Sequence, residues 1–553
     1  MGAKKMNKKG FVAAGLMLSL AIAGCSSNDG GGSADNGNGA DGNEPKEKAN
    51  ISSAIYDRGS VPAAEGSIED NRWTRWLSEN GPANVTFTAV PRWESEDKYN
   101  TLLASGSAPD LLFEYSPAIR NIWYQQKQLL PLDELIEEHS TSYKAMLEDY
   151  PALRKAGTLD DGKLYYFGRL NEVVPNRAVL IRKDWLDKLG LEYPKTTEEL
   201  YEVAKAFRTE DPDGNGKDDT YGLAVSGNST RTLDQIFQKM GFVLRDDEIV
   251  YAWDSFEEEA SFMKRLYEEG IIDRDFLNDK NGENARQDFV TGKLGIYPVL
   301  LNWKTFTTNE YKTLKDNVPD AEIIPIPYPE SRAGAFTPTF ANPVQMTAAI
   351  NRGADNPEAV MAYVDFLIEP STGQTLKYGV EGEHYEMGEN GCPVALDNDK
   401  TEQVGYTVDL QMLMTAPYVL EGKCGMESEF NPEVPLEQEG LDLFHQGLEA
   451  YIDLDRPYSE ITISEHMPQM PKELQTTLGE TNKTIGDLYS KAIVSGSNYT
   501  VQQALEEAQK VFQNGMGPEA EAWLKDWYAN NKDTAFLAED LYAVIREQQG
   551  IDK

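Results

Sequence analysis

Short strand-like segments alternate with amphipathic helix-like segments over residues 51–115. Segments 51–57 ("ISSAIYD"), 84–90 ("NVTFTAV") and 109–115 ("PDLLFEY") are predicted as strands, and 67–81 and 95–106 as helices. Because a single helix separates successive strands, the strands are expected to form an α/β sheet with crossover connections.

A second run of the same kind begins near Asn176. The predicted strand "RAVLIR" (177–182) precedes a helix at 183–190, and a further helix at 194–207 starts with Thr196 and Glu199 at capping-box spacing. With 553 residues and 40% hydrophobic side chains, the chain can build two lobes of roughly 150 to 250 residues each.

The C-terminal part has a different character. Residues from about 387 to 470 are irregular and rich in Met, Pro and Glu, and helical patterns return at 500–515 and 518–531. We expect these last helices to pack on a lobe and not to form a separate domain.

The N-terminus has the features of an export signal. Four lysines among the first nine residues precede the apolar run 11–23, which is too short for a comfortable transmembrane span. The following "IAGC" (22–25) resembles the lipobox of bacterial lipoproteins. We predict a signal peptide at 1–24, a diacylated Cys25 and a flexible Gly/Asn/Asp/Ser-rich tether over 25–50, which would anchor the protein to the membrane outside the cytoplasm. The alternative is an ordinary secretory signal with a chance cysteine.

The formal net charge of −40 restricts the partners of this chain. Such a surface repels phosphate backbones and anionic lipid headgroups, so nucleic-acid binding and electrostatic membrane adhesion are disfavoured. Membrane attachment is expected to come from the lipid instead.

Two further cysteines, Cys392 and Cys424, complete the set of three. Outside the cytoplasm, two thiols in one region pair more often than they stay free, so a disulfide is predicted.

The stretch "DPDGNGKDDTYG" (211–222) has oxygen-bearing side chains at the spacing of a calcium loop. Four side chains and one main-chain carbonyl would supply ligands, namely those of Asp211, Asp213, Asn215 and Asp219 and the carbonyl of Lys217. Position 12, which is a bidentate Glu in an EF-hand, is Gly222, and the next segment has a strand pattern. We therefore expect a static structural calcium site and not a sensor, with a metal-free polar turn as the alternative.

The order of several segments resembles that in extracellular solute-binding proteins of family 1, the sugar-binding group related to maltose-binding protein. The segments are the lipobox, the tether, "YDRG", "YNTLLASGSAPDLLFEYS", "RAVLIRKDWLDKLGLEYPKTTEELYEVAKAF", "DFVTGKLGIYPVLLNW" and "NPEAVMAYVDFL". The longer lipoproteins of that group resemble binders of oligosaccharides such as alginate or pectin fragments.

The resemblance implies the two-lobed α/β fold of periplasmic binding proteins of type II, with extra C-terminal helices. Lobe one would comprise 51–175 plus 338–370 and lobe two 176–337 plus 371–553, with crossings near Asn176 and Thr337. It also implies a monomer that captures a carbohydrate, expected to be an oligosaccharide, between lobes that close on it. The protein would then deliver the sugar to the permease subunits of an ABC importer.

A sugar site needs aromatic plates for the C–H faces and fixed polar groups for the hydroxyls. The resemblance places candidates at Trp303, Asp57, Arg58, Glu114, Tyr115, Ser116, Asn176, Arg177 and, more weakly, Tyr385. Each aromatic residue among them is equally suited to a protein core. Arg58 and Arg177 suit a uronate carboxylate, but surface acids are equally good partners for them.

Signatures of catalysis are scarce. The four histidines show no H-E-x-x-H spacing, and no G-x-S-x-G or Walker motif occurs. We predict a binding protein and not an enzyme. A secreted glycoside hydrolase or lyase, which needs only two carboxylates, and a peptide- or protein-binding lipoprotein are the alternatives.

Overall fold

The computed structural model describes residues 47–396, 400–453 and 455–548. The predicted signal peptide (1–24), Cys25 and the tether up to residue 46 therefore lie outside the described part of the chain. Within the described part, no helix has both the length and the apolar character that crossing a membrane requires.

The first sheet has five strands in the order β2-β1-β3-β11-β4. Their bounds are β1 Ala49–Asp57, β2 Ala83–Pro91, β3 Leu111–Phe113, β4 Phe167–Leu170 and β11 Val344–Ile350. β1 pairs in parallel with β2 and β3, whereas β11 is antiparallel to β3 and β4. The three strands predicted for residues 51–115 are thus confirmed, and they belong to one sheet with crossover helices between them.

The helices of this first lobe follow their sequence signals. The Asn71 side chain accepts hydrogen bonds from the backbone of Trp73 and Thr74 and so caps α1, and Gly81 follows its last residue. The helices are α1 Arg72–Asn80, α2 Ser95–Ser105, α3 Pro117–Gln125, α4 Asp133–His139, α5 Ser142–Asp149, α6 Pro151–Gly157, α14 Pro357–Ile368 and α15 Pro370–Tyr378.

The second sheet has four strands in the order β10-β5-β9-β6. Its strands are β5 Arg177–Arg182, β6 Tyr221–Leu223, β9 Leu294–Leu300 and β10 Ile323–Ile326. β6 is parallel to β9, and β5 is antiparallel to both β9 and β10. The surrounding helices are α7 Lys183–Leu189, α8 Thr197–Thr209, α9 Asn228–Ile236, α10 Trp253–Glu268, α11 Glu283–Val290, α12 Trp303–Phe306, the π-helical turn Thr307–Tyr311, α13 Lys312–Asn317 and α16 Pro435–Tyr451.

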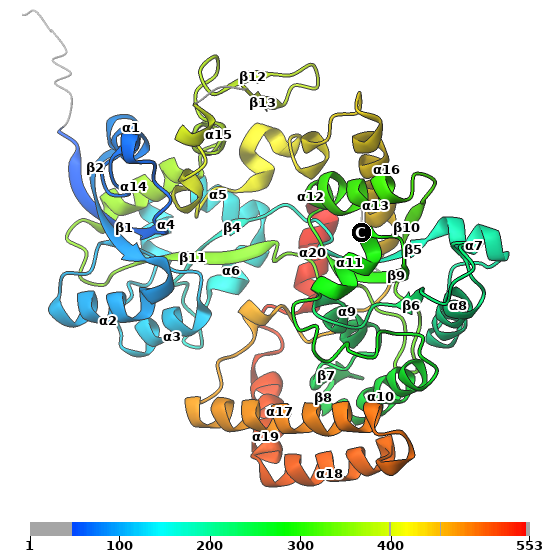
Figure 1. Ribbon diagram of the computed structural model, residues 1–553. Helices are drawn as coiled ribbons and strands as arrows, with labels where there is room; N and C mark the ends of the chain where they lie inside the picture. Colours follow the sequence, from blue (N-terminus) through cyan, green and yellow to red (C-terminus); the bar gives the residue numbers. More distant parts are fainter. Residues whose placement is uncertain (1–46, 397–399, 454, 549–553) are drawn as a thin grey trace, which may run out of the picture. The chain divides into compact units, whose positions relative to one another are not determined.

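The chain crosses between the two sheets after β4 and again before β11. It leaves the first sheet after β4, builds the second sheet, and returns to the first as β11 (Figure 1). The two connecting segments pair with each other, because Pro175 and Phe340 form an antiparallel bridge and the Asn171 N–H donates to the Pro343 carbonyl at 3.0 Å.

Three helices of the tail, α17 Lys472–Val494, α18 Val501–Asn514 and α19 Gly517–Asn531, pack beside α10 and the hairpin of β7 Phe242–Arg245 and β8 Glu248–Tyr251 (Figure 1). Tyr251 and Ala260 of the second lobe share an apolar cluster with Tyr489 and Phe512 of α17 and α18. These helices therefore extend the second lobe, as predicted.

The assignment of all of residues 371–553 to lobe two does not match this packing. Leu376 of α15, Tyr406 and Leu410 are buried in the core of the first lobe, as are Leu541 and Val544 of α20 (Ala538–Gln548). The apolar faces of these segments pack against the core of the first lobe and not against that of the second. The chain thus returns to lobe one after the last predicted boundary.

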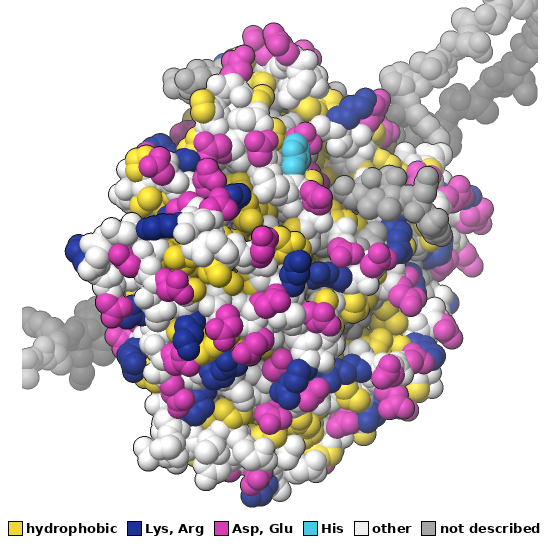
Figure 2. All heavy atoms as spheres, turned by 90° about the vertical axis from the view of Figure 1, so that its right-hand side faces the viewer, with side chains coloured by type: hydrophobic (Ala, Val, Ile, Leu, Met, Phe, Trp, Pro, Cys, Tyr) yellow, Lys and Arg dark blue, Asp and Glu magenta, His cyan; other side chains and the backbone are white. Residues whose placement is uncertain are grey.

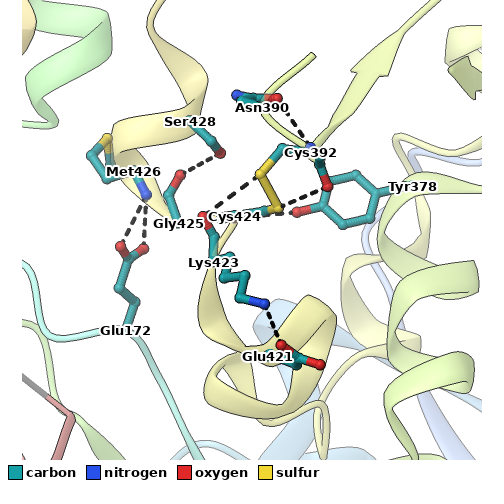
Figure 3. Close-up of a disulfide and its surroundings, with 11 residues drawn as sticks. Glu172, Tyr378, Asn390, Cys392, Glu421, Lys423, Cys424, Gly425, Met426 and Ser428 are labelled. Atoms are coloured by element: carbon teal, nitrogen blue, oxygen red, sulfur yellow. Dashed lines mark hydrogen bonds and ion pairs between the residues drawn. A yellow bond between two sulfur atoms is a disulfide. The ribbon is translucent and has the colours of Figure 1, made fainter. Parts of the chain in front are cut away.

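The structure joins Cys392 and Cys424 by a disulfide with a Cα–Cα distance of 5.5 Å, which is the predicted pairing (Figure 3). The bond ties the hairpin of β12 Tyr385–Met387 and β13 Pro393–Ala395 to the turn before Met426. The Met426 N–H in turn donates to both carboxylate oxygens of Glu172 at 2.9 and 3.1 Å, and Glu172 lies in the first crossing segment (Figure 3). The disulfide thus braces the loop that contacts the crossing.

Acidic and basic side chains are interspersed on the surface of this acidic protein. Figure 2 shows Asp and Glu side chains distributed over one face of the molecule with Lys and Arg side chains among them. Many surface arginines have a carboxylate partner, as in the pairs Arg72–Glu65, Arg245–Asp254 and Arg265–Glu198.

Candidate functional site

The carboxyl ends of β1, β2 and β3 meet at one edge of the first sheet because the strands run in parallel. Open α/β sheets bind ligands at such an edge. The residues directly after the three strands are Arg58, the pair Arg92 and Trp93, and the pair Glu114 and Tyr115. Each strand therefore ends in polar or aromatic side chains at the same place.

Arg58, one of the predicted residues, forms a bidentate ion pair with Asp409. Its Nε and Nη2 donate to the two Asp409 oxygens at 2.6 and 3.0 Å. Asp57 accepts a hydrogen bond from the Gly59 N–H at 2.8 Å and so shapes the turn after β1. The Arg58 guanidinium already forms two hydrogen bonds to a protein carboxylate, so fewer of its N–H groups can bind a ligand.

Aromatic rings and one arginine form a stack at this edge. The rings of Tyr56 and Tyr115 stack with centroids 5.7 Å apart, and the Arg92 guanidinium lies over both, 4.8 and 5.3 Å from their centroids. The Trp93 ring lies 5.4 Å from the same guanidinium and is 81% exposed. An indole that stays this exposed beside a rigid aromatic stack has a free face for a sugar ring.

Several buried polar atoms near this stack have no hydrogen-bond partner among the described residues. Glu114 is fully buried; its Oε1 accepts from the Ser116 N–H at 2.8 Å, and its carboxylate faces the Tyr56 hydroxyl, whose pKa burial and this carboxylate raise. The buried Nε atoms of Arg92 and Arg120 have no hydrogen-bond partner among the described residues. Because buried polar atoms are normally hydrogen-bonded, such a concentration indicates a place where a ligand or water completes the bonding.

The antiparallel strands β4 and β11 bring further groups to the edge. Arg169 lies opposite Gln345, to which its Nη2 donates at 3.0 Å, and its Nη1 donates to the Gln411 carbonyl at 2.9 Å. The Glu465 carboxylate accepts from the side chains of Asn342 and Gln345. Burial lowers the pKa of Arg169 and raises those of Tyr56 and Tyr115, so both phenols stay protonated and able to donate.

His466 gives this region a pH dependence. Its Nε2 lies 2.9 Å from the Val344 carbonyl oxygen, so this nitrogen carries the proton and donates. Burial lowers the pKa of His466 to about 4. A histidine with a depressed pKa in the folded state stabilises fully above its unfolded pKa of about 6.5, and that stabilisation is lost as the pH falls toward 4.

We therefore expect His466→Gln to lose less stability on acidification than the parent. The difference in the free energy of unfolding between pH 7.5 and pH 5 should be smaller by about 1 to 2 kcal/mol. Urea unfolding at both pH values measures it, with His445→Gln, whose side chain is 46% exposed, as the control. Equal pH dependence in parent and His466→Gln would contradict the assignment.

The matching edge of the second sheet contains a pocket of about 290 Å³. It lies where β6 and β9 end and β5 begins, and its walls include Asn228, Glu283, Arg286, Tyr297 and Asn302. The predicted residue Arg177 is adjacent, with its Nη1 donating to the Asn228 carbonyl at 3.3 Å. The predicted Asn176 offers a buried side-chain oxygen that has no partner among the described residues.

Trp303 occupies a core position, which was the alternative that the sequence left open for it. Its ring is 1% exposed, packs against Phe444, and donates through Nε1 to the Pro175 carbonyl at 2.7 Å. No face of the ring is open to a sugar in this structure, because α16 covers it. Tyr385 is also buried, at 4% exposure, and its hydroxyl accepts from the Gln374 amide.

The sequence analysis missed Arg92, Trp93, Arg169 and Asp409. The sequence did contain a signal for Arg92 and Trp93. The segment "PRWE" directly follows the predicted strand 84–90, just as the candidate residues of the site follow or end the other two predicted strands. Asp409 lies 351 residues from Arg58 in the chain, and nothing local marks it.

The calcium-like loop is closed by its own side chains. Asp211 accepts from the Gly216 N–H at 3.1 Å, and the Asn215 amide nitrogen donates to Asp213 and Asp219 at 2.6 and 3.1 Å. Over the described residues, no group of three or more His, Cys, Asp or Glu side chains is arranged to hold a metal ion. The amide nitrogen of Asn215 thus lies between two carboxylates, where a cation could lie instead. To bind calcium, Asn215 would have to present its amide oxygen to the ion.

The chain belongs to the bacterial extracellular solute-binding protein family, and the match to this family covers residues 64–374. One relative is the polygalacturonan/rhamnogalacturonan-binding protein YtcQ of Bacillus subtilis, 29% identical over 332 residues, which are 55% of this chain and 62% of the relative. Another is the fructooligosaccharide ABC transporter substrate-binding protein FusA of Streptococcus pneumoniae, 30% identical over 223 residues, which are 36% of this chain and 41% of the relative. The matches thus span less than two thirds of either relative.

Solved structures show the same two-lobed fold. An HMO-binding, ABC-transporter-associated solute-binding protein from Bifidobacterium longum infantis aligns with a TM-score of 0.63 at 18% identity, over 87% of this chain and 99% of the other. The alginate-binding protein AlgQ2 without calcium ion aligns at 0.56 with 20% identity, over 88% and 99%. An EF-hand mutant of FusA from S. pneumoniae with fructo-nystose aligns at 0.58 with 18% identity, over the same shares.

Proposed function

We propose that this chain captures an oligosaccharide outside the cytoplasm and delivers it to the permease of an ABC importer. The observation that carries the proposal is the 81% exposed Trp93 ring beside the Tyr56–Tyr115 stack, at the ligand-binding edge of the first sheet. Sugar rings bind to such aromatic plates through their C–H faces, and the surrounding arginines and carboxylates suit their hydroxyls.

The relatives support this function. YtcQ and FusA are named for binding polysaccharide or oligosaccharide, and the matched family consists of solute-binding proteins. We propose binding without catalysis and a monomeric protein. We also propose that a diacylated Cys25 attaches the protein to the cell membrane, as the lipobox-like "IAGC" suggests.

The predicted residues Asp57, Arg58, Glu114, Tyr115 and Ser116 are proposed for the first half of the site. Asn176 and Arg177, at the pocket of the second sheet, are proposed for the other half. The paired crossing segments support closure of the two lobes over the ligand.

A panel of acidic and neutral oligosaccharides tests the function. The mature chain should show a raised melting temperature with at least one of them, and chromatography should detect no product after prolonged incubation. A panel in which no oligosaccharide shifts the melting temperature, or in which one is cleaved, would contradict the proposal.

Trp93→Ala should weaken the best ligand of that panel by about 1 to 3 kcal/mol, or roughly 5- to 150-fold in Kd. The side chain is exposed, so its removal should leave the fold intact. Tyr193→Ala, which removes an aromatic ring that is 37% exposed outside the site, is the matched control. Calorimetric titration measures both; an unchanged affinity of Trp93→Ala would remove this residue from the site.

We also propose that the 211–219 loop binds calcium as a structural element. Burial and the neighbouring Asp211 and Asp219 carboxylates raise the pKa of Asp213, which is the repulsion that a divalent cation relieves. Asp211, Asp213, Asn215 and Asp219 would hold the ion, together with the Lys217 carbonyl and water. Solved structures of this fold include an EF-hand mutant of FusA and AlgQ2 without calcium ion, which supports a metal-binding loop in this chain.

Free calcium at 100 times its Kd should then stabilise the protein by about 2.7 kcal/mol, and a chelator should remove this effect. Asp213→Asn should abolish it. Asp218→Asn, in the same loop but paired with Arg208, should retain it. Thermal unfolding with calcium and with chelator measures the effect, and a melting temperature indifferent to both would contradict the calcium site.

A further inference from the structure

Three arginines at the edge of the first sheet are held by aromatic rings and not by carboxylates. Arg92 lies over Tyr56 and Tyr115, Arg169 lies 6.0 Å from the Tyr115 centroid, and Arg120 lies 5.0 Å from that of Tyr166. None of the three has a carboxylate at ion-pair distance within the described part of the chain. Elsewhere in this acidic protein, arginines such as Arg245 and Arg265 have one.

Stacking occupies only the faces of the Arg92 and Arg120 guanidinium groups, whereas Arg169 also donates hydrogen bonds to the Gln345 side chain and the Gln411 carbonyl. A guanidinium that stacks on a ring uses its face, while its five N–H groups point outward in the plane. Arg120 is 4% exposed, and its Nε has no hydrogen-bond acceptor among the described residues. The buried Nε of Arg92 likewise has no acceptor there. Burying an unpaired guanidinium is costly, so such groups mark positions where an anion completes the site.

Two protein carboxylates lie close by but do not pair with these arginines. Glu114 is occupied through Oε1 by the Ser116 N–H, and Glu465 by the side chains of Asn342 and Gln345. They offset part of the positive charge without occupying the N–H edges. The N–H groups that remain free therefore suit a ligand carboxylate bound beside Trp93.

We infer that the oligosaccharide bound here is acidic, and that Arg92 binds the carboxylate of a sugar residue adjacent to the one on Trp93. The inference rests on the proposed function and specifies its substrate class. An N–H fork and a carboxylate form two parallel charge-assisted hydrogen bonds, which a neutral sugar cannot replace.

Calorimetric titrations of the mature chain with four probes test this inference. The probes are tri-galacturonic acid, its methyl ester, sialyllactose and maltotriose. At least one of the two carboxylate-bearing sugars should bind roughly 10- to 100-fold more tightly than the ester and maltotriose, and this preference should shrink as salt is raised. Which acid binds separates a uronic acid from a sialic acid as the source of the carboxylate.

The variant Arg92→Gln should lower the affinity for the acid by a larger factor than the affinity for the ester, and so remove most of this preference. Arg92 is only half-buried, so the variant should fold. Arg352→Gln removes the same charge from an exposed position outside the site and should have no effect.

Equal or tighter binding of maltotriose or the ester would overturn the inference while leaving oligosaccharide binding in place. Equal loss of acid and ester affinity in Arg92→Gln would also overturn it. Absence of binding by all four probes would contradict the inference and the proposed function together.

Discussion

Replacing Lys239 by methionine is expected to lower the free energy of unfolding by about 3 to 5 kcal/mol. The Lys239 ammonium lies 2.8 Å from Asp234 of α9 and 2.7 Å from Glu259 of α10. Burial disfavours the charged ammonium, yet the two carboxylates raise its pKa above the ordinary value. Methionine fills the space but leaves two buried carboxylates without their counter-ion.

Urea unfolding at neutral pH measures this loss. Lys525→Met, which removes the partner of Glu521 from an exposed helical pair, should cost less than about 0.5 kcal/mol. Adding Glu259→Gln to Lys239→Met should restore part of the stability, because one uncompensated charge disappears. A Lys239→Met protein as stable as the Lys525→Met control would show that the triad is not an interacting unit.

Trp303→Ala is expected to destabilise the protein by about 3 to 5 kcal/mol, as for other fully buried aromatic side chains. The ring packs against α16, where a Cβ added at Gly447 would lie 2.5 Å from it. Its Nε1 also holds the Pro175 carbonyl of the first crossing segment at 2.7 Å. The substitution removes both the packing and this hydrogen bond.

Trp303→Phe separates the two contributions, since it keeps a ring and loses the N–H donor. Thermal and urea unfolding of both variants give the stability change, with Trp93→Ala as a surface control expected to change it little. A sugar affinity that fell in Trp303→Phe without loss of stability would restore Trp303 to the binding site and contradict its assignment to the core.

The first three strands followed from local sequence patterns. The alternation over residues 51–115 predicted β1, β2 and β3 within a few residues, because apolar periodicity and the helix signals at Asn71 and Gly81 act locally. The crossings near Asn176 and Thr337, which the family resemblance indicated, stay a prediction, and the bridge between Pro175 and Phe340 supports it.

The features that were missed depend on contacts between distant parts of the chain. Trp303 is buried because α16, more than a hundred residues later, covers it, and Arg58 is paired because Asp409 reaches it from the irregular segment. The C-terminal α20 returns to the first lobe, a choice that its own amphipathic pattern does not encode. Pattern identifies an apolar face but not the surface that will cover it.

A crystal structure of the mature chain with the tightest-binding oligosaccharide of the panel tests the central claim most directly. We expect a sugar ring lying on the Trp93 indole at the carboxyl ends of β1, β2 and β3, with an acidic group within hydrogen-bonding distance of Arg92. Ordered sugar bound elsewhere, with the Trp93 ring still exposed and Arg92 still without an acceptor, would contradict the account.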